Sequence, residues 1–389
     1  MRQVAIAGVS MTKFGKSEKI EIEMAAEAAM EAISESNLKP KDIQALFLGN
    51  AAGDIAENQT IMGGFIADDL GIAGVPAPRF ESACSSGSWA IATASMWVAS
   101  GFFDIVLAVG TERQTVLSTE FNHRMMGSGV HSFYESPTGL SFPGVFGMVA
   151  HLYAHKYGIS LQKLKDCLAR VAIKNHKNGA KNPKAQFQKE ITTEDYFKSI
   201  PVASPLQLYD CCPISDGASA AIITTAEIAK KLIRKPVHMI GMGWSSAGSL
   251  CGQKDITRAK ARETSAKIAY NMAGITPQDI DVAELHDCFT IAEILATEGL
   301  GFFEPGDGYK ALERGDTEIG GKIPCNPSGG LKAKGHPVGA TGLAQLYEIT
   351  KQIRGECGPR QVDGAKIGIT DTMGGSFAAI VTLILKKGW

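Results

Sequence analysis

The sequence lacks the features that would place the chain in a membrane or on a nucleic acid. No hydrophobic run approaches the roughly 20 apolar residues of a membrane-spanning helix. The net charge is −1, so no strong attraction to nucleic acid or to an anionic membrane surface is expected. The apolar run over residues 2–8 is too short for a secretory signal peptide and is typical of a first strand.

A regular pattern of cysteines is also missing. The eight cysteines form no CxxC pair and no disulfide framework. In a chain of this length they indicate free thiols in a reducing compartment, so we expect a cytoplasmic protein.

What the chain does have is size, apolar content and glycine. Its 389 residues are too many for one ordinary core, and 44% of them are hydrophobic. The 43 glycines predict many tight turns and close backbone contacts.

One structural unit is written twice in the sequence. In each half a short apolar run ends in glycine, a helical stretch follows, and a turn with the pattern xxPxDI precedes a strand. Strands that alternate with helices predict an α/β fold with parallel sheets covered on both faces. The matched segments are 2–8 and 236–243, 22–36 and 259–273, 38–43 and 275–280, 45–49 and 282–285, and 103–110 and 365–370.

The regular alternation of strand and helix patterns is interrupted over residues 112–205. We interpret this segment as an insertion over the active face. Segments 122–127 and 134–144 are loop-like, whereas 151–157 and 161–175 are predicted to be helical. The predicted organisation follows from this change. It comprises a first half of residues 1–111 plus 206–235, the insertion at 112–205, and a second half of residues 236–389.

Two residues at corresponding helix starts are the leading candidates for chemistry. Cys84 lies in Cys84-Ser-Ser-Gly87, where a helix N-terminus would stabilise a thiolate. His336 lies in His336-Pro-Val-Gly339, and a neutral imidazole can accept the thiol proton. Together they predict a cysteine nucleophile with its base. The alternatives are an inert buried thiol and a helix-capping histidine.

Two further motifs could contribute to the same site. His286 and Cys288 in His286-Asp-Cys-Phe289 alternate onto one face at the end of a strand, so both can reach one cavity. Gly374 opens a Gly-Gly turn whose backbone N–H groups can bind a carbonyl oxygen. Core packing and a simple tight turn are the structural alternatives.

Other patterns are weak. Gly241-Met-Gly243 resembles the start of a dinucleotide loop, but the third glycine is misplaced. His151 and His155 have a spacing that suits a metal, yet no acidic partner completes the motif, so we predict no metal. The side chains of adjacent Cys211 and Cys212 diverge on a strand, which makes them poor joint ligands.

The motifs together resemble those of the thiolase superfamily. The resemblance rests on Cys84 at a small-residue helix start, HDCF at 286–289, GHPVGATG at 335–342 and the terminal glycine turn, and it covers essentially the whole chain. The HDCF motif resembles the one found in the archaeal and sterol-carrier-protein-x branch, whereas other thiolases carry NEAF at this place. It implies a five-layered α-β-α-β-α fold with two duplicated halves, and a dimer or tetramer.

The resemblance also implies roles for individual residues. Cys84 would carry the acyl group, and His336 would activate it and help to form an oxyanion hole. His286 would be the second oxyanion donor, and Cys288 would move the α-proton of the second acyl-CoA. Backbone N–H groups of Cys84 and Gly374 would bind the thioester oxygen. Coenzyme A would be a co-substrate, with no permanently bound cofactor.

Two departures concern the substrate. Thr372 stands where a second cysteine of a CxG motif usually lies, and residues 370–373 read Thr-Asp-Thr-Met where this branch often has His-Asn. Residues 122–134 are polar and aromatic, which favours an acyl group larger than acetyl or charged. Both acetoacetyl-CoA and a benzoylsuccinyl-CoA-like aromatic substrate stay open. Lys332 and Lys334 are either neighbours of the CoA phosphates or solvated lysines.

The resemblance extends to partners and leaves alternatives. Relatives often work beside a small companion protein with an OB-fold and a zinc ribbon, and in archaea beside hydroxymethylglutaryl-CoA synthase. A ketosynthase or hydroxymethylglutaryl-CoA synthase is the alternative enzyme. A non-catalytic acyl-binding or lipid-binding scaffold is the alternative from another class.

Overall fold

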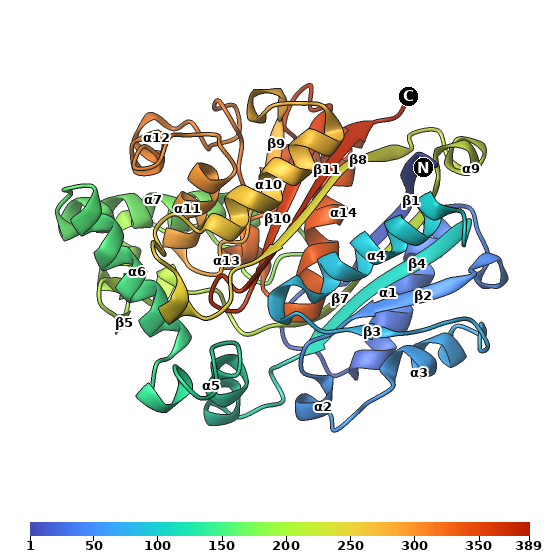
Figure 1. Cartoon of the computed structure of the whole chain (residues 1–389), viewed down its shortest axis with the longest axis horizontal. Coiled ribbons are helices and arrows are strands. Elements are labelled where there is room, and N and C mark those ends of the chain that lie inside the picture. The colour runs from blue at the N-terminus through green and yellow to red at the C-terminus, as the bar shows by residue number, and fades with distance from the viewer.

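A nine-stranded mixed sheet forms the centre of the protein, whose computed structural model describes residues 1–389 (Figure 1). The strand order is β3-β2-β4-β7-β1-β8-β11-β10-β9, and β5 (Pro201–Ala203) and β6 (Leu206–Gln207) form a separate pair. The strands of the large sheet are β1 (Val4–Met11), β2 (Ala45–Gly49), β3 (Arg79–Phe80), β4 (Ile105–Arg113), β7 (Asp216–Thr225), β8 (Val237–Ser246), β9 (Val282–Glu284), β10 (Ile367–Gly374) and β11 (Ala379–Lys387).

The expectation of wholly parallel sheets is wrong at the centre. The outer pairs β2–β4, β2–β3 and β9–β10 are parallel, as expected. The pairs of β1 with β7 and β8, of β4 with β7, and of β11 with β8 and β10 are antiparallel. For β10 and β11 the reason is connectivity, because they follow one another through a tight turn, which allows only antiparallel pairing.

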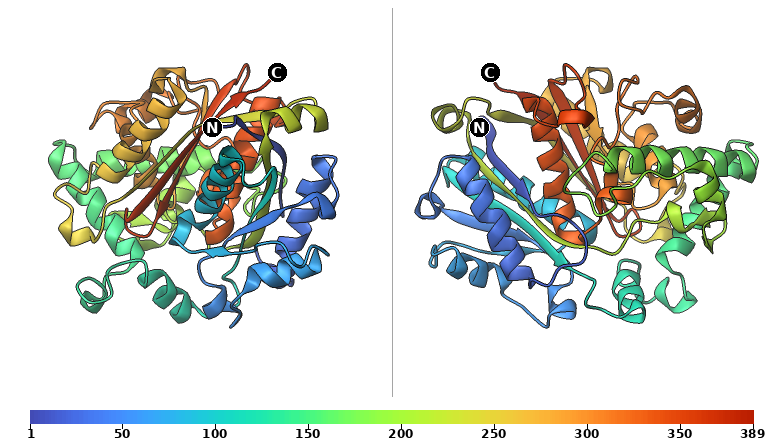
Figure 2. Two further views of the ribbon diagram at one scale, coloured as in Figure 1. Left: turned by 45° about the vertical axis from the view of Figure 1, so that its right-hand side comes forward. Right: turned by 180° about the vertical axis from the view of Figure 1, so that it is seen from behind.

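Two halves of this sheet face each other across a layer of helices (Figures 1 and 2). They are joined edge to edge only where Val4–Ile6 of β1 pairs with Val237–Met239 of β8. Helices α4 (Ser86–Ser100) and α14 (Thr341–Arg354) contact each other and lie between the halves. Helix α1 (Glu21–Glu35) covers the outer face of the first half, and α10 (Lys260–Ala273) that of the second. The predicted five layers are confirmed.

The duplication is visible in the local structure. The two xxPxDI segments form matching 3-10 turns at Pro40–Asp42 and Pro277–Asp279. In both turns the aspartate carboxylate accepts a backbone N–H three residues earlier, from Lys39 at 2.8 Å and from Thr276 at 2.8 Å. Proline at the first position and a capping aspartate at the third are enough to set such a turn locally.

The segment between the halves is more helical than expected. Residues 122–127 lie in helix α5 (Thr119–Gly127), whose first turn is capped by Ser118, and α6 (Phe142–Lys156) begins inside the segment expected to be a loop. There the hydroxyl of Ser141 accepts the N–H of Gly144 at 3.2 Å, and such a cap offsets the weak helix-forming tendency of the first turn. The predicted helix at 161–175 is α7 (Leu161–Gly179).

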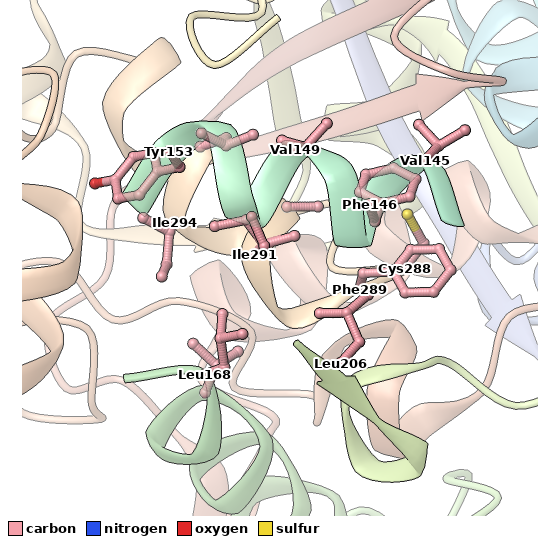
Figure 3. Close-up of a cluster of buried hydrophobic side chains, with 14 of the residues drawn as sticks. Val145, Phe146, Val149, Tyr153, Leu168, Leu206, Cys288, Phe289, Ile291 and Ile294 are labelled. Carbon is pink, nitrogen blue, oxygen red and sulfur yellow. The ribbon is translucent and has the colours of Figure 1, made fainter. Parts of the chain in front are cut away.

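Helices α6 and α7 pack on the second half of the chain. They share a buried cluster with α11 (Thr290–Gly299) and the residues just before it, which Figure 3 shows from Val145 to Ile294. The other helices are α2 (Gly53–Ala56), α3 (Met62–Asp69), α8 (Thr193–Lys198), α9 (Ala226–Leu232), α12 (Gly308–Arg314) and α13 (Gly330–Lys334). No helix of the structure has both the length and the apolar composition that a transmembrane span requires.

Candidate active site

The starts of helices α4 and α14 meet between the two halves of the sheet. A Cβ atom on Gly87 would lie 2.5 Å from the carbonyl oxygen of Gly339, and one on Gly342 would lie 2.5 Å from the backbone nitrogen of Ser88. Only glycine permits this backbone approach. The contact brings the Cys84 turn and the His336 turn, which are 252 residues apart in the sequence, to one point.

Cys84 and His336 are in direct contact. The Nε2 atom of His336 lies 3.3 Å from the sulfur of Cys84, and both side chains are buried. The other ring nitrogen, Nδ1, lies 2.7 Å from the hydroxyl oxygen of Thr341. That hydroxyl donates its hydrogen to the carbonyl oxygen of Pro337 at 2.9 Å. The Thr341 oxygen therefore accepts from Nδ1–H, which leaves Nε2 as the free base facing the thiol.

Burial keeps both members of this pair neutral. Removal from water raises the pKa of the Cys84 thiol to about 12, although the backbone N–H of Gly375 points at the sulfur and opposes the rise. Burial and the nearby charge of Lys334 lower the pKa of His336 to about 3. The resting site is a thiol beside a neutral imidazole, so the proton must move as the sulfur attacks.

His286 completes the group from the second half. Its ring lies 5.1 Å from that of His336, centre to centre, at an angle of 84°. The donor atoms of Cys84, His286 and His336 all lie within 4.8 Å of one another. Both ring nitrogens of His286 are buried without a hydrogen-bond partner in the protein, and burial lowers its pKa well below the usual value. A buried, unpaired imidazole is expected to serve a bound ligand.

Asp287 explains why its two neighbours face the site. Its carboxylate points away from them and accepts the N–H groups of Leu331 at 2.6 Å and of Lys332 at 3.3 Å, at the start of α13. It also accepts from the side chain of Asn175 in α7 at 2.7 Å. Fixing Asp287 on one side turns His286 and Cys288 to the other side, because successive residues of an extended segment alternate.

Cys288 lies at one end of the apolar cluster in Figure 3, beside Phe146 and Phe289. It is buried, and this burial raises the pKa of its thiol well above the usual value. A thiol in this setting is protonated at neutral pH and can donate that proton to a stronger base.

Four of the predicted side chains line one cavity of about 410 Å³, the size of a small-molecule site. Its walls are mainly apolar and come from the insertion, from the segment after β6 and from the second half. The lining residues are Cys84, Asn122, His123, Met126, Phe142, Pro143, Val202, Leu208, Cys211, Cys212, Pro213, Ile214, His286, Cys288, Phe289, His336 and Gly375.

The glycine turn contributes differently from the expectation. The backbone N–H groups directed at the Cys84 sulfur belong to Gly375, one residue beyond Gly374, and to Cys84 itself. The oxyanion roles of the Cys84 and Gly374 N–H groups stay predictions. Thr372, at the position of the second cysteine, is buried outside the cavity lining, and its hydroxyl donates to that of Ser88 at 2.6 Å. It therefore supports the start of α4 and offers no group to the cavity.

Both expectations for Lys332 and Lys334 are wrong. Their side chains are buried, so they are neither solvated nor placed on the surface to bind a phosphate. The Lys332 ammonium donates to the carbonyl oxygen of Cys211, and that of Lys334 pairs with Glu284 at 3.0 Å. These contacts join α13 to the segment before β7 and to β9, and contacts between such distant segments cannot be read from the local sequence.

The sequence did not single out the roles of Thr341 or of the apolar walls, and it indicated Asn122 only as part of segment 122–134. Thr341 lies inside the GHPVGATG motif five residues after His336, so the motif itself held a signal. Asn122 is buried against the cavity, and its Oδ1 atom has no hydrogen-bond partner, whereas its amide N–H groups are used by backbone carbonyls. The polar and aromatic character of residues 122–134 linked this segment to the substrate, and the structure places Asn122 and His123 of it in the cavity lining.

Comparison with known proteins decides the family. The family model for the thiolase N-terminal domain matches residues 4–227, and the model described as thiolase C-terminal domain-like matches residues 244–387. The chain belongs to the thiolase family. Thiolases are acyltransferases, so this protein is an acyl-transferring enzyme. Family membership therefore favours a thiolase over a ketosynthase and over a non-catalytic scaffold.

Individual relatives cover nearly the whole thiolase chain. An acetyl-CoA acetyltransferase of Methanothermobacter thermautotrophicus is 42% identical, over 97% of each chain. The benzoylsuccinyl-CoA thiolase subunit BbsB of Thauera aromatica is 36% identical, over 97% of this chain and 96% of that one. Human sterol carrier protein 2 is 35% identical, over 98% of this chain and 72% of the longer protein.

Solved structures agree on the fold. The structure titled Ltp2-ChsH2(DUF35) aldolase is 27% identical, with a TM-score of 0.84 over 99% of this chain and 98% of that one. Human mitochondrial 3-ketoacyl-CoA thiolase is 18% identical, with a TM-score of 0.76 over 99% of both chains.

Proposed function

We propose that this thiolase cleaves or forms 3-oxoacyl-CoA esters through an acyl group carried on Cys84. The observation that carries the proposal is the 3.3 Å contact between the Cys84 sulfur and the unprotonated Nε2 of His336, in a cavity that also holds His286 and Cys288. A nucleophile next to a base of fixed tautomer is the arrangement that acyl transfer requires.

In the first half of the condensation, Cys84 attacks an acyl-CoA thioester while its proton moves to His336. The negative charge that develops on the thioester oxygen is stabilised by a nearby N–H donor, which we assign to His286 in its neutral form. The C–S bond to CoA then breaks, and the leaving thiolate takes the proton of the Cys288 thiol. This leaves an acylated Cys84, a protonated His336 and a Cys288 thiolate.

The second step of the condensation uses the protonated His336 and the Cys288 thiolate that the first step produced. The Cys288 thiolate removes an α-proton from a second acyl-CoA, and the resulting carbanion attacks the acyl carbon on Cys84. The new C–C bond forms as the C–S bond to Cys84 breaks, and His336 returns its proton to the sulfur. Cleavage is the reverse, with CoA as the acceptor. Two separate protons move, which explains the need for two acid/base groups.

The cavity walls favour an acyl group larger than acetyl. Phe142, Phe289 and Leu208 offer apolar surface, which an acetyl group would leave largely uncovered. The unpartnered Oδ1 of Asn122 suits a hydrogen-bond donor on the substrate. Acetoacetyl-CoA is the second candidate, because a relative at 42% identity is an acetyl-CoA acetyltransferase.

We also propose assembly into a homodimer or tetramer and the docking of a small companion protein beside the cavity. Phe133 and Tyr134 of the insertion are 75% and 65% exposed, and exposed aromatic side chains of this kind favour a protein partner. BbsB is named as a subunit, and the structural relative is titled with a DUF35 partner.

All eight cysteines are free, which supports a cytoplasmic location.

The proposal is tested with a panel of aliphatic, aromatic and dicarboxylic 3-oxoacyl-CoA esters, with and without a co-purified small subunit. We expect kcat/KM for the longer or aromatic esters to exceed that for acetoacetyl-CoA. Cys84→Ala should lower the rate at least about 10³-fold, whereas the exposed Cys251→Ser should keep it. Full activity of Cys84→Ala would overturn the proposal.

A second experiment separates the two thiols. Cys288→Ser should still form the acyl-enzyme, seen by intact mass after addition of an acyl-CoA, while C–C bond formation slows by about 10²–10⁴-fold. Loss of the mass adduct in Cys288→Ser would contradict this division of roles between Cys84 and Cys288.

A further inference from the structure

The donor atoms at the centre of the site also match what a thiophilic metal ion binds. We propose that Cys84, His286 and His336, besides their roles in acyl transfer, form an inhibitory site for Zn²⁺ or a similar divalent cation. Their donor atoms lie within 4.8 Å of one another, and the sulfur and Nε2 of His336 are already 3.3 Å apart. Tetrahedral zinc bonds of about 2.0–2.3 Å place neighbouring ligand atoms roughly 3.4–3.6 Å apart.

The lone pairs needed for coordination are available. Thr341 holds the proton of His336 on Nδ1, so Nε2 presents a lone pair to the cavity. Both nitrogens of His286 lack a hydrogen-bond partner in the protein, and the ring is 1% exposed. A buried imidazole without any partner is the second, independent sign of a ligand at this point.

The kinds of ligand atom in this site determine which cations it favours. Two imidazoles and one sulfur, without a carboxylate oxygen, favour Zn²⁺, Co²⁺ or Cd²⁺ over Mg²⁺ and Ca²⁺. Three protein ligands leave a fourth position open toward the cavity, which water or the thiolate of free CoA can fill.

Binding involves no redox change. The S–H bond of Cys84 breaks, a bond from sulfur to the cation forms, and one proton leaves to the buffer. The imidazoles are neutral beforehand and release none. Because the cation occupies the sulfur and the Nε2 lone pair, acyl transfer stops while it is bound, and an acyl group on Cys84 excludes the cation in turn.

Cobalt provides a readout that does not depend on activity. In the Cys251→Ser background, which removes the exposed thiol, Co²⁺ should bind at one ion per chain with a sulfur-to-cobalt charge-transfer band. Calorimetry in buffers of different ionisation enthalpy should give about one proton released per ion. Zn²⁺ should displace the cobalt band, and a hundredfold excess of Mg²⁺ should not.

Substitution or alkylation of the proposed ligands tests whether cobalt binds at Cys84 and His286. The charge-transfer band should vanish in Cys84→Ser, and His286→Gln should weaken cobalt binding at least tenfold. Protein alkylated at Cys84 with iodoacetamide should also lose the band, which tests the site without a substitution that could disturb folding. An unchanged band in Cys84→Ser or in the alkylated protein would overturn the proposal, and so would unchanged affinity in His286→Gln. The proposed acyl transfer through Cys84 does not depend on cation binding, so these outcomes would leave that proposal unaffected.

Discussion

The Nδ1 atom of His336 lies 2.7 Å from the hydroxyl of Thr341, and this contact determines which nitrogen of His336 faces Cys84. The threonine hydroxyl has one hydrogen, which it gives to the carbonyl of Pro337, so it can only accept from Nδ1–H. The reactive state of the nucleophile therefore depends on a residue that never touches it.

Removal of this acceptor should impair acylation. In Thr341→Val the Nδ1–H of His336 loses its partner, and the tautomer with the proton on Nε2 becomes populated. We expect acylation of Cys84 to slow by about 10–100-fold, as measured by rapid-quench intact mass. Thr341→Ser keeps the hydroxyl and should retain most of the rate. Equal acylation rates in Thr341→Val and the unmodified enzyme would show that the tautomer is fixed by another contact.

The pH dependence of Cys84 alkylation reports the neutral pair. With the thiol pKa raised to about 12 by burial, the thiolate fraction grows about tenfold per pH unit up to pH 10. We expect the rate of iodoacetamide labelling, followed by peptide mass in the Cys251→Ser background, to rise without a plateau from pH 7 to pH 10. A plateau that begins near pH 7 would instead indicate a thiolate–imidazolium pair.

Glu112 should make the protein more stable in mild acid. It is buried, its carboxylate accepts the N–H groups of Gly339 and Ala51, and burial raises its pKa to about 7. An unfolded glutamate has a pKa near 4.3, so between about pH 4 and pH 7 the folded state binds more protons. The contribution of Glu112 to the free energy of unfolding is therefore largest below about pH 4 and is lost as the pH rises through 7.

Glu112→Gln removes this titration. The change in urea midpoint between pH 5.5 and pH 7.5 should be smaller in Glu112→Gln than in the unmodified protein. Glu120→Gln, at the exposed start of α5, is the matched control and should leave the pH dependence unchanged. An identical pH dependence in Glu112→Gln would rule out Glu112 as the titrating group.

Asp287 should matter for both stability and the second chemical step. In Asp287→Asn an amide replaces a carboxylate that accepts the N–H groups of Leu331 and Lys332, so at least one buried donor loses its partner. We expect a loss of about 1–3 kcal/mol in the free energy of unfolding, measured in urea, with slower condensation because His286 and Cys288 move. Asp363→Asn, on an exposed turn, should change neither quantity.

The four side chains that line the cavity and the duplication of the fold could both be predicted from the sequence. Cys84, His336, His286 and Cys288 converge on one cavity as expected, because each lies in a short motif whose local structure is set by its own residues. The paired 3-10 turns at Pro40–Asp42 and Pro277–Asp279 are of the same kind. A proline and a capping aspartate act within four residues, so no distant contact is needed.

The surroundings of these four side chains depend on long-range packing and could not be predicted from the sequence. The tertiary structure buried Lys332 and Lys334 against carbonyl and carboxylate groups more than 40 residues away, and it placed Gly375 at the sulfur. It also brought Asn122 and Phe142 of the insertion to the cavity wall. These outcomes depend on long-range packing between the halves and the insertion, where burial sets the charge state of a side chain and a distant backbone supplies its partner.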